Sequence, residues 1–459
     1  MKTVAKILFA GMMIYGPATM ALAENPIIQT CFTTDPAPMV HGDRLYIYTG
    51  HDENNADFFW MQEWRVYSTT DMVNWTDHGS PLAIEDFSWG DDRAWAPQCV
   101  ERDGKFYFYV PLHSKLSGTM AIGVAVGDSP TGPFKDALGH PLVDGSWDYI
   151  DPTVFVDDDG QAYLYWGNPE IYYVKLNPDM VSFDGEVQKI IQTEDGFGAP
   201  GPKERVEGKK YRDNYTEGPW FFKRDGKYYL VYAAGGVPEH IAYSMSDSPT
   251  GPWKYMGEIM PLSDTNSFTN HSGIIDYKGK SYFFYHTGKL PGGGGFARSV
   301  AVEPFEYNPD GTIPVIHPTD EGAPSVGTLD PMRRVEAETM SWSKGVSTEM
   351  NSNTGVYVSD IHNGDYIKVS GANFGSGAPA KFGASVASAL RGGSIEVRID
   401  AVDGDLVATL EVPGTGGWEE WRYIEVPALM EIPGVHDLYF VFKGRKGPKL
   451  FNFDYWNFK

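Results

Sequence analysis

The segment Asp225-Gly226-Lys227-Tyr228-Tyr229-Leu230-Val231-Tyr232 joins a tight-turn signal to a run of aromatic and aliphatic side chains. The same pattern returns as DGKFYFY at 103–109, DGQAYLY at 159–165 and GKSYFFY at 279–285, and in a looser form as GDRLYIY at 42–48. An apolar run that follows a glycine turn is typical of a buried β-strand. The chain is therefore predicted to contain five repeats, each built around one such strand.

The spacing of these repeats predicts the fold. The aligned tyrosines lie 61, 56, 66 and 53 residues apart and are Tyr46, Tyr107, Tyr163, Tyr229 and Tyr282. A unit of that length accommodates about four short strands, and radial repetition of such units is the plan of a β-propeller. We expect an all-β chain whose first domain, residues 24–325, is a five-bladed β-propeller.

Composition and charge restrict the partners. The 459 residues include 61 Asp and Glu against 37 Lys and Arg, and the formal net charge is −24. Such an excess of acid argues against a nucleic-acid partner, because binding to phosphate backbones needs basic patches. Aromatic residues make up 14% of the chain, and their faces suit the apolar faces of sugar rings.

Residues 1–23 have the pattern of a secretory signal peptide, with Lys2 and Lys6 before an apolar stretch and a small-residue cleavage site at its end. We expect a secreted protein, extracellular or periplasmic, with no membrane attachment after cleavage; the alternative is an uncleaved N-terminal anchor. Secretion permits a disulfide. However, Cys31 and Cys99 fall at repeat positions roughly 25 Å apart, so two buried free thiols are predicted.

In a propeller, the innermost strand of each blade lines the central axis. The positions about twelve residues before the aligned tyrosines are Asp35, Trp95, Asp151, Glu217 and the pair Asn270-His271. A single Asp-Pro in a loop is usually a turn, but three carboxylic acids at equivalent positions of different blades indicate one shared site. Like charges held together raise one another's pKa and cost stability, so such a cluster is expected to persist only where it is used.

Three converging carboxyl groups suit the hydrolysis of a glycosidic bond. One acid protonates the leaving oxygen, and one base activates water. Inverting enzymes hold these two groups roughly 6.5–9.5 Å apart, which leaves room for the water. A third carboxylate beside the acid is expected to keep that acid protonated near neutral pH by charge repulsion.

The segments that hold these acids, TDPAP at 34–38, IDPTVF at 150–155 and YTEGPW at 215–220, resemble the three acidic motifs of glycoside hydrolase family 43. The resemblance covers about residues 28–325. It implies a five-bladed propeller and an inverting mechanism. It also implies that Asp35 is the general base, that Glu217 is the general acid, and that Asp151 raises the pKa of the acid and orients it.

Four further residues are candidates around this site. By the same resemblance, His271 lies beneath the catalytic floor, where it can contact a calcium or sodium ion, and Arg298 reaches the bound sugar. The alternatives for these two are a hydrogen-bonded core histidine and a structural ion pair. Trp95 is expected either to stack on the sugar or to pack against the funnel wall. His51 is expected on the rim after the first blade, near the substrate.

The pattern of apolar and polar residues changes after a Pro- and Gly-rich stretch, and residues 326–334 are predicted to be a linker. Ile395, Val397 and Ile399 alternate with polar residues, and further short strands follow within residues 335–459. This pattern predicts a second domain, a β-sandwich of jelly-roll-like form.

Acidic residues lie at both ends of this second domain. Glu336 and Glu338 open it and Asp454 closes it. First and last strands often lie side by side, so these carboxylates can share an oxygen-rich calcium site. These ends, with an aromatic residue on the Gly-Gly-Trp418 loop, resemble carbohydrate-binding module family 6. That resemblance implies that the calcium is structural and that the ligand cleft is lined by Tyr357, Trp418 and Asn452.

Together these features predict a secreted inverting glycoside hydrolase that releases terminal α-L-arabinofuranosyl or β-D-xylosyl residues from arabinoxylan-type hemicellulose. Its expected partner is a plant cell-wall polysaccharide or its oligosaccharides, because a tethered binding module helps most on a polymer. The alternatives are a β-1,4-xylosidase, an endo-arabinanase, a retaining fructan or sucrose hydrolase, and a glycan-binding propeller without catalysis.

Overall fold

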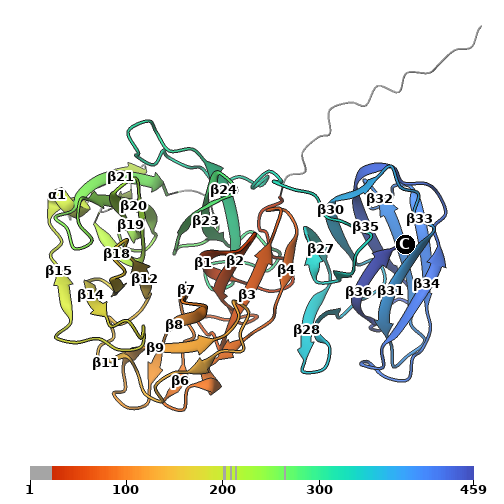
Figure 1. Cartoon of the computed structure of the whole chain (residues 1–459), viewed down its shortest axis with the longest axis horizontal. Helices are drawn as coiled ribbons and strands as arrows, with labels where there is room; N and C mark the ends of the chain where they lie inside the picture. Colours follow the sequence, from red (N-terminus) through yellow and green to blue (C-terminus); the bar gives the residue numbers. More distant parts are fainter. Residues whose placement is uncertain (1–22, 200–202, 207–208, 212–213, 263–264) are drawn as a thin grey trace, which may run out of the picture.

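The computed structural model describes residues 23–199, 203–206, 209–211, 214–262 and 265–459. The predicted signal peptide lies outside these residues, except for Ala23. Figure 1 shows the chain as two bodies side by side, a ring of blades and a sandwich, both built almost entirely of strands. Among the described residues the helical segments are α1 (Glu194–Phe197) and a 3₁₀ turn (Ile84–Asp86), and none is long and apolar enough to cross a bilayer.

Five antiparallel sheets of the described residues form the blades in chain order, which confirms the predicted propeller. Their strands are, in blade 1, β1 (Thr34–His41), β2 (Arg44–Gly50), β3 (Glu63–Thr69), β4 (Trp75–Asp77) and β5 (Leu82–Ala83); in blade 2, β6 (Gly90–Asp92), β7 (Gln98–Arg102), β8 (Lys105–Ser114), β9 (Met120–Gly127), β10 (Lys135–Asp136) and β11 (Val143–Asp144); in blade 3, β12 (Thr153–Val156), β13 (Ala162–Trp166), β14 (Ile171–Leu176) and β15 (Gln188–Ile190); in blade 4, β18 (Tyr215–Arg224), β19 (Lys227–Ala234), β20 (His240–Ser246) and β21 (Lys254–Met260); and in blade 5, β22 (Gly273–Tyr277), β23 (Lys280–Thr287) and β24 (Ser299–Phe305). A separate hairpin, β16 (Lys203–Val206) and β17 (Lys209–Tyr211), lies between blades 3 and 4 in the sequence.

The aromatic strands predicted from the repeats are β2, β8, β13, β19 and β23, and each pairs with the strand before it. Their rings fill the space between neighbouring blades. Tyr165 of blade 3, for example, stacks on Phe221 of blade 4 with ring centroids 4.4 Å apart. Stacked aromatic pairs of this kind stabilise more than their buried area alone, so the repeated aromatic run is what packs blade on blade.

The N-terminal segment closes the ring. The backbone N–H of Ile27 donates to the carbonyl of Val300 on β24 (2.9 Å), and the side chain of Asn25 accepts from the backbone N–H of Val302 (3.0 Å). Residues next to blade 1 in the sequence thus cover the outer edge of blade 5. Closure removes an exposed strand edge and fixes all five inner strands around one axis.

The backbone is irregular where the inner strands meet the axis. Asp35 and Asp151 have φ of 52° and 58°, a left-handed conformation that Asp tolerates better than most residues. The register of β1 against β2 shifts between Thr34 and Ala37, and that of β18 against β19 shifts on both sides of Glu217. Such bulges re-aim side chains, and here they occur at the acidic positions.

The second body is a β-sandwich, as predicted. Alternate residues of its strands are buried, including Ile395 and Val397, which have no exposed surface. One sheet contains β25 (Val335–Glu336), β28 (Ser347–Asn351), β29 (Gly355–Ser359), β31 (Lys381–Ala387), β34 (Arg422–Pro427) and β36 (Asn452–Phe458), and the other contains β27 (Trp342–Lys344), β30 (Tyr366–Gly375), β32 (Gly393–Ile399), β33 (Leu406–Val412) and β35 (Gly434–Lys443).

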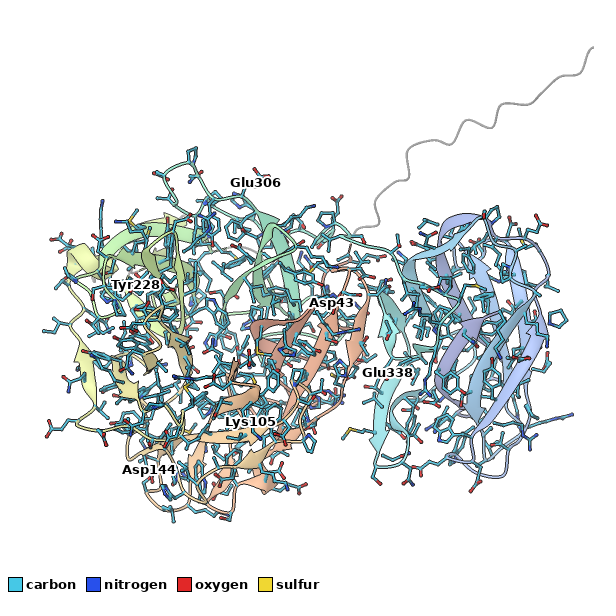
Figure 2. The ribbon with its side chains drawn as sticks, in the orientation of Figure 1. Asp43, Lys105, Asp144, Tyr228, Glu306 and Glu338 are labelled. Carbon is cyan, nitrogen blue, oxygen red and sulfur yellow. The ribbon has the colours of Figure 1, made fainter. Side chains whose placement is uncertain are left out.

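The two bodies are hydrogen-bonded to each other. Strand β26 (Thr339–Met340) leaves the sandwich and pairs with β4 of blade 1, and the Asn74 side chain bonds the backbone of Ser370 in both directions at 2.8 Å. The predicted linker also packs against the second domain, because the backbone of Leu329 is hydrogen-bonded to the backbone of β30. Figure 2 labels Glu338, which lies at this junction. Blade 1 therefore extends directly into the second domain.

Both cysteines are free, as predicted. Cys99 is fully buried in the propeller core, as predicted. Cys31 was also predicted to be buried, but it is only half-buried. The cause is its place next to the domain junction, where its Sγ lies 3.2 Å from the hydroxyl of Tyr67.

Candidate active site

Residues from all five blades line one small cavity on the propeller axis. Blade 1 contributes Asp35, blade 2 Pro97, blade 3 Asp151, blade 4 Gly218 and blade 5 His271. Glu217 lies beside them, and polar atoms of Asp151, Glu217 and His271 are all within 4.8 Å of one another. The structure therefore brings together the acids that the repeat alignment selected.

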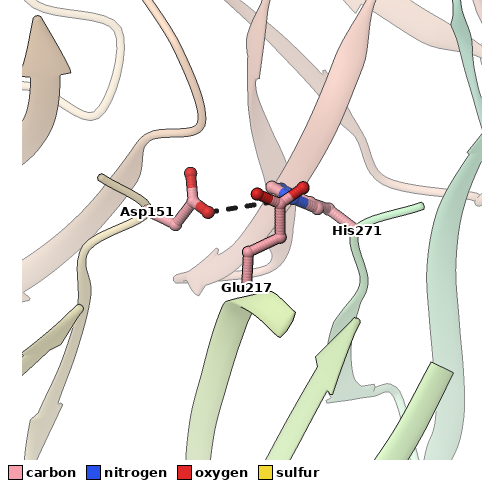
Figure 3. A group of neighbouring side chains, drawn as sticks. All are labelled: Asp151, Glu217 and His271. Atoms are coloured by element: carbon pink, nitrogen blue, oxygen red, sulfur yellow. Dashed lines mark hydrogen bonds and ion pairs between the residues drawn. The ribbon is translucent and has the colours of Figure 1, made fainter. Parts of the chain in front are cut away.

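His271 lies between the three acids. Its Nδ1 is 3.3 Å from Oδ1 of Asp35, and its Nε2 is 3.4 Å from Oε1 of Glu217 and 3.9 Å from Oδ2 of Asp151. Figure 3 shows Asp151, Glu217 and His271 facing one another. Burial alone lowers the pKa of His271, but the carboxylates raise it well above its usual value. A charged imidazole thus holds the cluster together, with both ring nitrogens engaged.

Asp35 is the carboxylate whose charge is best stabilised. Its Oδ1 lies 3.5 Å from Nη1 of Arg298 and accepts a hydrogen bond from the Thr34 hydroxyl at 2.9 Å. Burial raises the pKa of Asp35, but Arg298 and His271 outweigh it and lower the pKa well below its usual range. Asp35 is therefore ionised across the working pH range of most enzymes.

Arg298 is buried beneath the site and is held by a residue that the sequence did not indicate. Its Nε donates to Oδ2 of Asp52 and its Nη2 to Oδ1 of Asp52, both at 2.9 Å. The structural ion-pair alternative thus describes this arginine, which also contacts Asp35. The neighbouring His51, predicted near the substrate, turns away and pairs with Glu63 at 3.1 Å.

Asp151 and Glu217 differ in how well their charges are stabilised. Burial, together with the charges of Glu217 and Asp35, raises the pKa of Asp151 to about 7. Burial also raises the pKa of Glu217, but hydrogen bonds from His271 and the Asn168 amide lower it overall. The pKa of Glu217 is thus lowered here, whereas a raised pKa was predicted, because the charged histidine stabilises the Glu217 carboxylate.

Aromatic side chains surround the entrance. Trp95 is half-buried, and its Nε1 donates to the carbonyl of Phe59 at 2.9 Å, so it packs against the funnel wall. The Arg93 guanidinium lies 5.7 Å from the ring of Trp95 and 5.5 Å from that of Trp147. Trp147 and Trp60 remain 55% and 42% exposed. Exposed rings beside a polar cavity are suited to contact with sugar faces.

In the sandwich, the predicted acidic residues are neighbours, but among the described residues their carboxylate oxygens do not all lie within 4.8 Å of one another. β25 pairs with β36, which places Glu336 opposite Tyr455 and next to Asp454. Oε2 of Glu338 and Oδ1 of Asp454 are buried without a hydrogen-bond partner among the described residues. Burial and the neighbouring acids raise the pKa of Glu338 well above its usual value. Buried carboxylate oxygens without a hydrogen-bond donor suit a bound cation; here the Arg334 guanidinium donates to Glu336 at 2.8 Å and lies 3.7 Å from Oδ1 of Asp454.

The structure adds one residue to the three that were predicted to line the ligand cleft of the module. The Asn452 amide donates to the carbonyl of Trp418 at 2.8 Å, and the Lys449 ammonium lies 5.0 Å from the Trp418 ring. Tyr357, however, packs edge-on against Trp421 at 5.2 Å. Oδ1 of Asn452 and Nε1 of Trp421 have no partner among the described residues. Trp421, three positions beyond the residue chosen from the sequence, therefore belongs to the same cluster.

A propeller with three carboxylates around its axis, followed by a sandwich with an aromatic cleft, defines a carbohydrate-active hydrolase. The model of the family described as glycosyl hydrolases family 43 matches residues 23–313, and that of carbohydrate binding module family 6 matches residues 336–459. The chain belongs to glycoside hydrolase family 43 and carries a family 6 binding module.

Relatives of known structure and name agree with this assignment. An arabinoxylan arabinofuranohydrolase of Bacillus subtilis is 35% identical over 95% of this chain and 92% of the relative. A crystal structure of an arabinoxylan arabinofuranohydrolase from Bacillus subtilis, in complex with cellotetraose, has a TM-score of 0.81 at 34% identity and covers 96% of this chain and 99% of that one. A xylosidase/arabinosidase of Bacteroides ovatus is 34% identical over 66% of this chain and all of the relative.

Proposed function

We propose that this glycoside hydrolase releases terminal α-L-arabinofuranosyl residues from arabinoxylan-type hemicellulose, with inversion. The observation that carries the proposal is the cavity where Asp35, Asp151 and Glu217 meet around His271. The match to an arabinoxylan arabinofuranohydrolase over both domains supports the substrate. Relatives named xylosidase/arabinosidase favour release of β-D-xylosyl residues as the second candidate; two of them match about the propeller alone, and a third, 25% identical, matches 94% of the chain.

The environments of the acids support different roles. Asp35, ionised beside Arg298, acts as the general base that activates water, and Glu217 acts as the general acid once it has taken a proton from Asp151. Asp151, with its raised pKa, supplies the neighbouring proton and orients the acid through the backbone N–H of Gly218 (3.1 Å). The imidazole of His271 lies between these two acids, with Nδ1 3.3 Å from Asp35 and Nε2 3.4 Å from Glu217, and inversion requires that the acid and the base stand apart with room for water.

Rates of cleavage of two nitrophenyl glycosides and of arabinoxylan distinguish between the candidate functions. We expect 4-nitrophenyl α-L-arabinofuranoside to be cleaved faster than 4-nitrophenyl β-D-xyloside, and arabinose to be released from arabinoxylan without shortening of the xylan chain. NMR of the first product should show the inverted anomer. Faster cleavage of the xyloside would favour the second candidate, shortened polymer would indicate endo action, and binding without turnover would contradict catalysis.

In the module, Glu336, Glu338 and Asp454 would hold a structural calcium ion, which would supply positive charge to two buried carboxylates. We expect EDTA to lower the unfolding temperature of the wild type and added Ca²⁺ to restore it. Glu338→Gln should lose this response, whereas Glu396→Gln, at the exposed pair with Arg398, should keep it. An unfolding temperature that ignores EDTA would contradict the site.

The pH dependence provides a second readout of the same site. The pKa of Glu338 is raised by folding, so without calcium its contribution to stability is complete below its ordinary pKa and is lost as the pH rises through the folded value. We expect the EDTA-treated protein to lose stability toward neutral pH, and Ca²⁺ to diminish that loss.

The module is proposed to bind the polymer through the half-buried rings of Trp418 and Trp421, with Tyr357 buried against Trp421 and Asn452 buried beside Trp418. Trp421→Ala should weaken retention on insoluble arabinoxylan by about 10-fold or more, since one ring–sugar contact contributes roughly 1–3 kcal/mol when truncated. Turnover of a 4-nitrophenyl substrate should be unchanged. Tyr423→Ala, on a neighbouring exposed strand, is the control; equal retention of both variants would exclude the cleft.

Export is proposed from residues 1–23 alone. N-terminal sequencing of the protein recovered outside the cytoplasm should begin at or near Glu24. An intact Met1 in a membrane fraction would indicate the anchor instead.

A further inference from the structure

Arg93, near the opening of the axial cavity, combines a strained backbone with an unpaired buried donor. It directly follows β6 of blade 2 and has a φ of 64°, in the left-handed region that is uncommon for a long side chain. The Nε–H of its guanidinium is buried and has no hydrogen-bond acceptor among the described residues. An unpaired buried donor costs stability, and backbone strain gathers at sites that contact ligands. Both observations direct attention to what Arg93 binds.

The guanidinium of Arg93 lies among aromatic rings from three segments of the chain. Its Cζ is 5.5 Å from the ring centroid of Trp147, 5.7 Å from that of Trp95 and 6.0 Å from that of Phe58. Nη1 donates to Oδ2 of Asp92 at 2.8 Å, whereas Nη2 donates to none of the described residues. The side chain retains 19% of its exposure. Arg93 thus has N–H groups available for the oxygen atoms of a ligand.

Trp147 offers an open aromatic face beside this guanidinium. At 55% exposure it is the most exposed tryptophan of the described chain. Its ring is nevertheless held in place, because the ring of His113 lies 5.6 Å from it and Nδ1 of His113 is paired with Asp91 at 2.7 Å. An exposed ring that is fixed by its neighbours is suited to stack on the apolar face of a sugar.

Both residues stand next to the segments that line the cavity. Arg93 lies three positions before Ala96 on blade 2, and Trp147 lies four positions before Asp151 on blade 3. A sugar on these two side chains would lie outside the carboxylates, where the part of the substrate other than the cleaved sugar belongs. In arabinoxylan that part is the main chain, whose xylopyranosyl rings offer apolar faces to an aromatic ring and hydroxyl oxygens to a guanidinium.

We propose that Arg93 and Trp147 form a binding site for the xylan main chain beside the arabinofuranosyl branch. Trp147 stacks on a xylopyranosyl ring, and Arg93 donates to hydroxyl oxygens of the same chain, so the site favours branched xylan over simple arabinofuranosides. The inference rests on the proposed function, because it assigns the main chain of the same substrate. Trp95 takes no part in it, since its Nε1 donates to the carbonyl of Phe59 within the funnel wall.

The kinetics of two substrates test this site. Trp147→Ala and Arg93→Met should each lower kcat/KM on arabinoxylan by about 10-fold or more, the usual effect of losing an aromatic anchor or a charged hydrogen bond. On 4-nitrophenyl α-L-arabinofuranoside, which has no main chain, kcat/KM should stay within about threefold of the wild type. Trp147→Phe keeps an aromatic face and should retain most of the rate on arabinoxylan.

Inhibition by unbranched xylotetraose tests the same site without cleavage of a polymer. We expect xylotetraose to inhibit the wild type on the nitrophenyl substrate. Its inhibition constant should rise by about 10-fold or more in Trp147→Ala and Arg93→Met, and much less in Trp147→Phe. This readout reports on the propeller alone, because the module takes no part in turnover of the nitrophenyl substrate.

Arg224→Met is the matched control. The Arg224 guanidinium lies 4.1 Å from the ring of Tyr307, at the end of β18 that is away from Glu217. Both rates and the inhibition constant should be unchanged in this variant. Unfolding temperatures measured by circular dichroism check that the variants fold. If Arg93→Met does not fold, the pair Trp147→Ala and Trp147→Phe, at an exposed position, carries the test.

Three results would overturn the proposal. One is an unchanged kcat/KM on arabinoxylan in Trp147→Ala. Another is an equal loss on both substrates, which would assign the side chains to the cleaved sugar or to the fold. The third is inhibition by xylotetraose that Trp147→Ala does not weaken. A wild type that cleaves xylotetraose and releases no arabinose from arabinoxylan would instead contradict the proposed function, so the two failures are distinct.

Discussion

Asp35→Asn is expected to lower kcat on every cleavable substrate by about 10²- to 10⁴-fold, the usual contribution of a general base. The amide cannot take the proton from water, and the loss should therefore be the same for good and poor leaving groups. Glu217→Gln should behave differently, with a large loss on arabinoxylan and a smaller one on nitrophenyl substrates. This contrast between the two variants assigns base and acid by a measurement rather than by position.

Folding of Asp35→Asn is expected to remain close to that of the wild type. Asn has nearly the same volume, and Arg298 keeps Asp52 as its main counterion at 2.9 Å. Thermal unfolding followed by circular dichroism checks this. If Asp35→Asn kept activity within about threefold, which is below the smallest usual base effect, Asp35 would not be the base.

The acids on the axis were predictable because they occupy equivalent positions in repeats. Once the tyrosines are aligned, Asp35, Asp151 and Glu217 fall at one place in each unit, and the geometry of a propeller brings that place to the centre. The same alignment found the Asn270-His271 pair, although not that the histidine would be charged and contact all three acids.

Asp52 was not selected by the alignment because it lies outside the axial positions that were compared. It lies in the connection after β2, and only the folded chain shows that it contacts Arg298. His51 and Asp52 show why the sequence alone cannot select the residue that faces the site. Neighbouring side chains in an extended segment point to opposite sides, and the sequence does not tell which of the two points inward. The structure places Asp52 inward on Arg298 and His51 outward on Glu63.

The sequence also could not predict which of the acids at the site carries a proton. Repulsion among acids predicts that one of them keeps a proton, but hydrogen bonds decide which. His271 and Asn168 stabilise the charge of Glu217, whereas the pKa of Asp151 is raised. In the module, Trp421 was missed for a similar reason, because the loop conformation decides which tryptophan meets Tyr357.

Asp52→Ala is expected to destabilise the propeller by about 3–5 kcal/mol, the usual cost of leaving one partner of a buried ion pair alone. The Arg298 guanidinium would lose its two hydrogen bonds to Asp52 and keep the longer contacts with Thr269 at 3.3 Å and Asp35 at 3.5 Å. The unfolding temperature should fall by roughly 6–20 °C. Asp320→Ala, which breaks an exposed pair with Lys289, should leave it nearly unchanged.

A double variant separates stability from function at this pair. Asp52→Leu combined with Arg298→Met replaces both buried charges by apolar side chains of similar volume, and much of the stability lost in Asp52→Ala should return. Activity should not return, because Asp35 would then lack the guanidinium that keeps its pKa low, and the pH below which kcat/KM falls should move upward. If the double variant recovered full activity with an unchanged pH profile, Arg298 would serve the fold alone, and the ionised state of Asp35 would have to come from His271.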